Sequence, residues 1–146
     1  MRKINYIVVH CSATREGCTL TSEALEAEHR RRGFRTTGYH YYIRRDGTVL
    51  GTRSLELPGA HCRGHNKYSI GICYEGGLDA RGNPKDTRTP EQRSALHLLV
   101  YQLLQQFRNA GVCGHRDLSP DLDGDGTVEP WEWVKQCPCF EVSKEF

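Results

Sequence analysis

Hydrophobic and polar positions along the chain predict short strands separated by two amphipathic helices. Residues 4–11 are dense in Ile and Val and alternate only weakly, which is typical of a buried strand. Four further strand-like segments are shorter: residues 39–44, 48–52, 69–74 and 112–115. The first two of these flank Asp46-Gly47, a turn signal that indicates a β-hairpin.

The two helices are predicted at residues 19–32 and from Thr89 onward. Thr21 or Ser22 is a suitable N-cap for the first helix, and Gly33 is its expected stop. In the second, Thr89 is the expected N-cap, Pro90 takes the first helical position and Gln92 can complete a capping box. Apolar residues then recur at helical spacing on one face: Leu96, Leu99, Val100, Leu103, Leu104 and Phe107. We expect this helix to end at Gly111 and residues 78–88, rich in turn formers, to be a surface loop.

These elements predict an α/β protein with a single domain over residues 1–146 and a mixed central β-sheet flanked by helices. A length of 146 residues suits one domain, and we find neither an internal repeat nor a linker.

Composition narrows the classes of partner. The net charge of +2 is too small to argue for nucleic acid. No run approaches eighteen apolar residues, so membrane insertion is not expected. The N-terminus shows no secretory h-region, so we expect a protein that stays in the cytoplasm until it is released, or that leaves by another route. We expect a monomer.

Histidine and cysteine supply the candidate chemistry. The chain has seven cysteines, which we interpret as mostly buried, reduced thiols. His10 ends the first predicted strand, His115 follows the last, and Cys137 or Cys139 comes late in the chain. Two imidazoles and one thiolate can fill three positions around Zn²⁺ and leave the fourth for water, as in catalytic zinc sites.

Seven short motifs occur in an order that resembles the zinc-dependent N-acetylmuramoyl-L-alanine amidase family. This family includes T7-lysozyme-type phage amidases and peptidoglycan recognition proteins, and the resemblance covers residues 4 to about 140. The motifs are Val9-His10-Cys11-Ser12-Ala13-Thr14, Gly38-Tyr39-His40, Arg45-Asp46-Gly47, His61 with Gly64 and Asn66, Ser69-Ile70-Gly71-Ile72, Gly114-His115 and Lys135-Gln136-Cys137-Pro138.

The resemblance implies a role for individual residues. His10, His115 and Cys137 match the zinc ligands, since the family's last ligand is a Cys followed by Pro; Cys139 is the competing sulfur. Tyr39 and Lys135 match the catalytic residues, against the alternatives of a packed aromatic and a solvated lysine. His61 matches a position near the cleft, where we expect substrate contact or oxyanion support.

The activity implied is hydrolysis of the amide that joins N-acetylmuramic acid to L-alanine in peptidoglycan. A phage or prophage endolysin of bacterial or phage origin, accumulated inside the host and released to the cell wall, would suit this chain. The alternative is a peptidoglycan-binding module without catalysis, although the retention of Cys137, Tyr39 and Lys135 favours an enzyme.

Residues 121–132 depart from the compact family pattern. They match the twelve-residue calcium loop, with acids at positions 1, 3 and 5, Gly at 6, an apolar residue at 8 and Glu at 12. The candidate Ca²⁺ ligands are Asp121, Asp123, Asp125, Thr127 and Glu132. Ser119-Pro120 disfavours a leading helix, whereas a helix from about Pro130 is plausible. The alternative is that these residues form a solvated acidic turn without calcium. If calcium binds, we expect it to stabilise the segment between His115 and Cys137.

Overall fold

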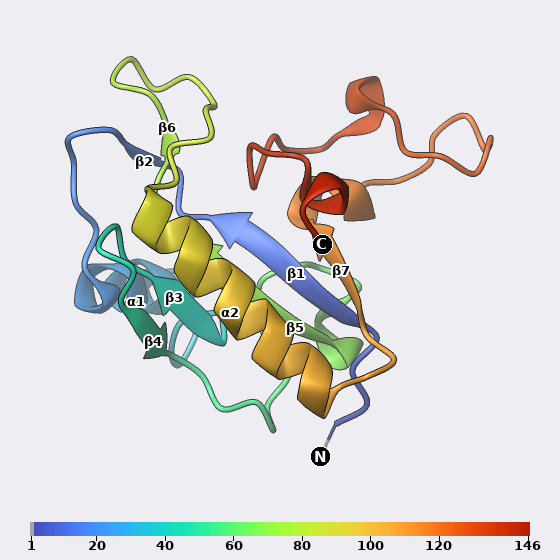
Figure 1. Cartoon of the computed structure of the whole chain (residues 1–146), viewed down its shortest axis with the longest axis horizontal. Coiled ribbons are helices and arrows are strands. Elements are labelled where there is room, and N and C mark those ends of the chain that lie inside the picture. Colours follow the sequence, from blue (N-terminus) through green and yellow to red (C-terminus); the bar gives the residue numbers. More distant parts are fainter. Residues whose placement is uncertain (1) are drawn as a thin grey trace.

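The computed structural model describes residues 2–146 and centres on a five-stranded mixed sheet (Figure 1). The strand order is β4-β3-β5-β1-β7, and the bounds are β1 Tyr6–Cys11, β3 Tyr41–Ile43, β4 Val49–Gly51, β5 Ser69–Tyr74 and β7 Gly111–Gly114. β1 lies parallel to both β5 and β7, β3 is parallel to β5, and β4 pairs antiparallel with β3. The predicted α/β class, the mixed sheet and the hairpin are therefore confirmed.

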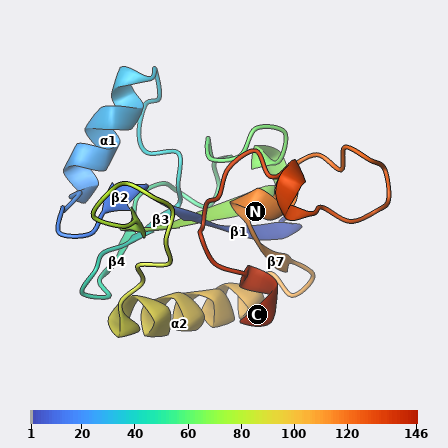
Figure 2. The same cartoon turned by 90° about the horizontal axis from the view of Figure 1, so that it is seen from above.

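Side-chain alternation on these strands separates two faces of the sheet. Ile7 and Val9 of β1 and Ile70 and Ile72 of β5 belong to one apolar cluster with helix α2 (Pro90–Gln106). Figure 2 shows α2 running along one side of the sheet. His10 follows Val9, so it lies on the opposite face.

Helix α1 (Ser22–Arg31) lies on that opposite side of the sheet (Figure 2). Leu25 of α1 packs in a small second cluster with Tyr42 of β3 and Cys73 of β5. The rest of this face is covered by connecting segments instead of a second long helix (Figures 1 and 2). The fold therefore leaves room for polar side chains beside the carboxyl end of β1.

The N-terminus of α2 has the predicted capping box. Thr89 Oγ1 accepts a hydrogen bond from Gln92 N at 3.1 Å, and Gln92 Oε1 accepts one from Thr89 N at 3.0 Å. Gln92 is fully buried and also donates to the carbonyl oxygens of Ile43 and Glu75. The start of α2 is thereby fixed to the sheet.

The predicted end of this helix was wrong. α2 ends at Gln106, and Gly111 begins β7, where its N–H donates to Asn5 O at 2.8 Å. Because Gly111 pairs with β1 as part of the sheet, it cannot also belong to the helix. The helix therefore ends several residues earlier, and a short turn connects it to β7.

Two elements lie in segments for which no strand was expected. β2 (Thr14–Arg15) pairs with β6 (Gly77–Leu78) in a small separate sheet, so the first residue of the predicted surface loop belongs to a strand.

The helix considered after Pro130 is only a short 3₁₀ turn, η3 (Pro130–Glu132). The described residues also form the 3₁₀ turns η1 (Asn66–Tyr68), η2 (His115–Leu118) and η4 (Val142–Lys144).

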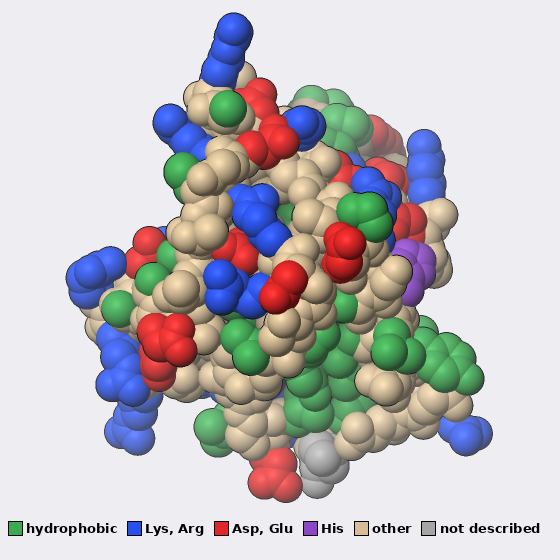
Figure 3. Space-filling model, turned by 60° about the vertical axis from the view of Figure 1, so that its left-hand side comes forward, with side chains coloured by type: hydrophobic (Ala, Val, Ile, Leu, Met, Phe, Trp, Pro, Cys, Tyr) green, Lys and Arg blue, Asp and Glu red, His purple; other side chains and the backbone are tan. Residues whose placement is uncertain are grey.

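Charges of both signs are interspersed on the face drawn in Figure 3, in keeping with the small net charge. Within residues 2–146, neither α-helix combines the length and apolar character needed to cross a bilayer.

Candidate metal centre

His10 is the most enclosed of the candidate ligands. Its side chain is 1% exposed, and Nε2 lies 2.8 Å from Nδ1 of His61. Each nitrogen of an imidazole ring can make one hydrogen bond or one metal bond. Because Nε2 of His10 is hydrogen-bonded to His61, Nδ1 is the nitrogen that can bind a metal. Burial, followed by the nearby rings of His61 and His115, lowers the pKa of His10 well below its usual value. The ring is therefore neutral, as ligation requires.

The fold brings His115 and Cys137 to the same point. His115 follows β7, the neighbour of β1, and its ring centroid lies 4.5 Å from that of His10. Cys137 Sγ accepts a hydrogen bond from Cys11 N at 3.1 Å, while Cys137 O accepts one from Arg116 N at 2.9 Å. These two bonds hold the C-terminal segment between the ends of two parallel strands.

One ligand atom from each of His10, His115 and Cys137 lies within 4.8 Å of the others. Ligands of a tetrahedral zinc ion lie roughly 3.5 Å apart, given metal–ligand distances of about 2.0–2.3 Å. Two nitrogens and one sulfur in this arrangement fit zinc better than calcium or magnesium, which prefer oxygen. Cys139 is not in the group; its Sγ lies 4.0 Å from Cys11 Sγ and 3.4 Å from Gly77 O.

His61 connects His10 to the interior of the sheet. Its side chain is buried, and its Nε2 lies 3.1 Å from Ser69 Oγ, so both ring nitrogens are engaged. Asn66 holds the preceding turn, because its Oδ1 accepts hydrogen bonds from the N–H groups of His61 and Cys62. This geometry favours orientation of His10 over direct contact with a substrate.

Tyr39 and Lys135 flank the group from different segments. The Tyr39 ring centroid lies 5.0 Å from that of His10, and burial, followed by the Cys73 and Cys137 thiols, raises the pKa of Tyr39 well above its usual value. The hydroxyl therefore stays protonated at neutral pH and can act as a donor. Lys135 is exposed and lines the neighbouring cavity.

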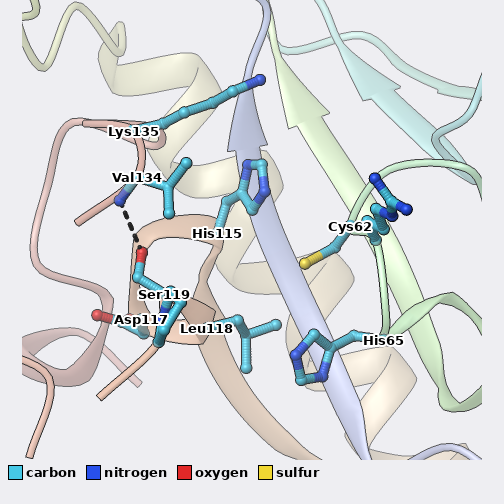
Figure 4. A pocket seen from close by; sticks show the side chains of 10 residues that line it. Cys62, His65, His115, Asp117, Leu118, Ser119, Val134 and Lys135 are labelled. Atoms are coloured by element: carbon cyan, nitrogen blue, oxygen red, sulfur yellow. Dashed lines mark hydrogen bonds between the residues drawn. The ribbon is translucent and has the colours of Figure 1, made fainter. Parts of the chain in front are cut away.

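A cavity of about 640 Å³ opens beside His115 (Figure 4). Its walls come from three stretches of chain: residues 62–65, 115–120 and 134–135. Ser119 Oγ accepts a hydrogen bond from Val134 N at 3.1 Å, which joins two of these walls. The sequence did not single out Arg63 or His65 here, because neither follows a strand or a recognisable spacing.

The acidic loop gathers its carboxylates into two overlapping groups. Asp121, Asp123 and Glu132 form one, and Asp123, Asp125 and Glu129 form the other, each with oxygens within 4.8 Å of one another. Hydrogen bonding with Glu132 and then Asp125 raises the pKa of Glu129 to about 8.

Backbone N–H groups already bond several of these carboxylates. Asp121 accepts hydrogen bonds from Gly124 and Gly126, and Asp125 accepts one from Thr127 N. Glu132, which is buried, accepts from the N–H groups of Leu122 and Glu129. Glu129, at position 9 of the loop, was not among the predicted ligands.

Comparison with known proteins gives consistent results. The family model described as N-acetylmuramoyl-L-alanine amidase matches residues 1–138. The endolysin of Klebsiella phage KP32 is 35% identical over 143 residues, which are 98% of this chain and 85% of that protein.

Two solved structures show the same fold. The N-acetylmuramoyl-L-alanine amidase LysC from Clostridium intestinale superposes with a TM-score of 0.73 at 27% identity, covering 94% of this chain and 77% of that one. Bumblebee PGRP-SA also gives 0.73, at 21% identity, with 99% and 80% coverage, and this likeness supports the fold alone.

Proposed function

The chain belongs to the N-acetylmuramoyl-L-alanine amidase family, and we propose that it is a zinc-dependent enzyme that cleaves the amide between N-acetylmuramic acid and L-alanine in peptidoglycan. The observation that carries the proposal is the convergence of His10, His115 and Cys137 beside an open cavity. Three protein ligands leave one position for water, which distinguishes a catalytic from a structural zinc site.

When bound, zinc would supply a Lewis acid and lower the pKa of a water molecule to roughly 7. Around it, the protein orients its own groups. His61 fixes the ring of His10 through the Nε2–Nδ1 contact of 2.8 Å, and Ser69 in turn fixes His61. Such supporting contacts commonly change metal affinity or activity by roughly 10- to 100-fold.

Lys135 and Tyr39 are the proposed catalytic residues. The ammonium group of Lys135, at the cavity wall, can stabilise the oxyanion that develops when the amide carbonyl is attacked. Tyr39 keeps its proton, so its hydroxyl can donate a hydrogen bond to substrate or water near His10. Neither role requires a second metal ion.

The similarity to phage endolysins favours an enzyme that acts on the bacterial cell wall. The alternative is a binding module, because a peptidoglycan-recognition protein of Drosophila melanogaster is 29% identical over 120 residues. The presence of the complete candidate ligand group favours catalysis over binding alone.

Metal analysis combined with turnover of purified sacculi tests this proposal. We expect about one zinc per chain, and new L-alanine amino termini that appear in step with new carboxyl groups on the muramic acid of the glycan strands. Cys137→Ser should lose both zinc and turnover, whereas Cys18→Ser, at an exposed thiol, should keep both. Zinc that stays in Cys137→Ser and leaves in Cys139→Ser would show that the other sulfur is the ligand, and binding of sacculi without release would support the binding module.

We further propose that residues 121–132 bind Ca²⁺ as a structural ion. The loop has calcium-loop spacing, and crowded carboxylates repel one another unless a cation or protons intervene. Calcium should raise Tm in a concentration-dependent manner, and Asp123→Asn should reduce that rise. Asp79→Asn, in another exposed turn, is the matched control. A Tm that is the same in calcium and in chelator would contradict the calcium site.

A further inference from the structure

Two thiols that the proposed chemistry does not use lie next to each other. Cys11 Sγ, at the end of β1, is 4.0 Å from Cys139 Sγ in the C-terminal segment. A disulfide bond is about 2.05 Å long, so roughly 2 Å of approach would join them. Cys139 has φ 71°, a conformation that non-glycine residues rarely adopt, and its N–H is held by Gln136 O at 2.8 Å.

The surroundings of the pair suit a disulfide. Cys11 is buried, and both residues belong to or pack against the main apolar cluster. Gly77 leaves the necessary space, because a Cβ at that position would lie 2.5 Å from Cys11 Sγ. A cross-link here would replace two weak S–H donors with an apolar group in an apolar environment.

Cys137 offers the competing pairing, since its Sγ accepts a hydrogen bond from Cys11 N. Oxidation of Cys137 would remove a ligand atom from the group formed with His10 and His115. A thiolate held by a metal is not free to pair, so zinc would direct oxidation toward Cys139. Cys137 and Cys139 are separated by one residue, which disfavours a bond between them.

We propose that Cys11 and Cys139 form a disulfide when the protein reaches an oxidising compartment, while Cys137 stays a thiolate for zinc. Both thiols lose their protons and together give two electrons to a disulfide oxidant, such as oxidised glutathione or a protein disulfide, which is reduced to two thiols. The proposal rests on the proposed function for the compartment, because peptidoglycan lies outside the reducing cytosol. The bond would tie the strand that carries His10 to the segment that carries Cys137.

The test uses the zinc-loaded full chain, equilibrated with oxidised glutathione and then alkylated without reduction. Mass spectrometry should show a loss of about 2 Da and a cross-link between tryptic peptides 4–15 and 136–144, with fragmentation assigning Cys139. Closing so long a loop should raise Tm by about 5–15 °C, reversibly on reduction. Cys139→Ser should abolish the cross-link and the rise, whereas Cys18→Ser should keep both.

Three results would overturn the disulfide: no cross-link at equilibrium, a bond from Cys11 to Cys137, or glutathione adducts alone. Zinc content measured on the same samples keeps the two proposals separate. A protein that never holds zinc but still joins Cys11 to Cys139 would refute the zinc centre and support the disulfide. A protein that holds zinc with both thiols free after oxidation would do the reverse.

Discussion

The ring of His61 occupies space that a side chain at position 71 would fill. A Cβ added to Gly71 would lie 2.6 Å from Cγ and Cδ2 of His61, closer than real side chains approach. Gly71 also donates its N–H to His40 Nδ1, so the strand cannot easily shift away from the ring. The position of His61, and through it that of His10, depends on a glycine in the neighbouring strand.

Gly71→Ala should therefore displace His61 and weaken its contact with His10. We expect zinc affinity or turnover to fall by about 10- to 100-fold, while the far-ultraviolet circular dichroism spectrum stays the same as that of the wild type. Gly51→Ala is the matched control, because a Cβ there meets no atom within 4 Å. Equal losses in the two variants would indicate general destabilisation of the sheet.

At the residue scale, sequence reasoning selected the candidate ligands but not the residues that hold them in place. His10, His115 and the Cys-Pro pair stand in recognisable motifs, so resemblance was sufficient to select them. The partner of His10 is 51 residues away, and its contact depends on the path of an irregular loop. A motif gives the identity of His61, but only the packed sheet shows that His61 is enclosed between His10 and Ser69.

Among the elements, α2 shows how local signals fix a boundary. Thr89 caps the helix and also donates through Oγ1 to Arg45 O at 2.6 Å, so one hydroxyl joins the helix to the β3–β4 hairpin. Such a cap is worth about 1 kcal/mol, and a second hydrogen bond adds a similar amount.

Thr89→Ala should lower the free energy of unfolding by about 1–2 kcal/mol and Tm by about 3–8 °C. Thr89→Ser, which keeps the hydroxyl, should recover most of the loss, and zinc content at room temperature should be unchanged in both. Denaturant unfolding with the two variants measured side by side provides the comparison. A serine variant as unstable as the alanine variant would exclude the hydroxyl as the cause.

Elements that depend on distant pairing were predicted less well. The start of α2 is encoded within four residues, whereas its end is set by the pairing of Gly111 with Tyr6 across the sheet. Strands β2 and β6 lie more than sixty residues apart in the sequence. Each is only two residues long, which is too short to show the alternation of apolar and polar residues that predicts a strand. The capping residues at the start of α2 could be recognised from the sequence because they lie next to one another. The strand pairs that set other boundaries could not, because they join residues far apart in the chain.

For the whole molecule, an ion cluster fastens the C-terminal segment. Arg88 is buried, bonds Asp86 at 2.9 Å and Glu145 at 2.6 Å, and its guanidinium lies 3.3 Å above the Phe140 ring. Phe140 packs in the main core beside Cys139. Arg88 thus fixes the segment that also carries Cys137.

Arg88→Ala should destabilise the protein by about 3 kcal/mol at pH 7, since it removes the buried guanidinium that bridges Asp86 and Glu145. Burial would raise the pKa of Asp86, but the hydrogen bonds and positive charge of Arg88, together with the charge of Arg93, outweigh it and lower that pKa. A separate hydrogen bond from Arg88 lowers the pKa of Glu145. Depressed carboxyl pKa values stabilise the fold above the unfolded values of about 4, and this contribution is lost as pH falls through the folded values.

The difference in unfolding free energy between wild type and Arg88→Ala should therefore be full at pH 7 and shrink below about pH 4. Denaturant titrations across this range measure it, with Arg93→Ala as the control, because Arg93 is exposed and contacts only the rim of the cluster at Asp86. A difference that stays constant down to about pH 2.5 would assign the effect to lost packing on Phe140.

The three candidate ligands stand at positions 10, 115 and 137, and the first of them lies on a strand sandwiched between β5 and β7. A nascent polypeptide emerging from the ribosome holds His10 long before its two companions exist. Nothing short of nearly complete synthesis can bring the three candidate ligands together, so partial translation products should lack the proposed metal centre.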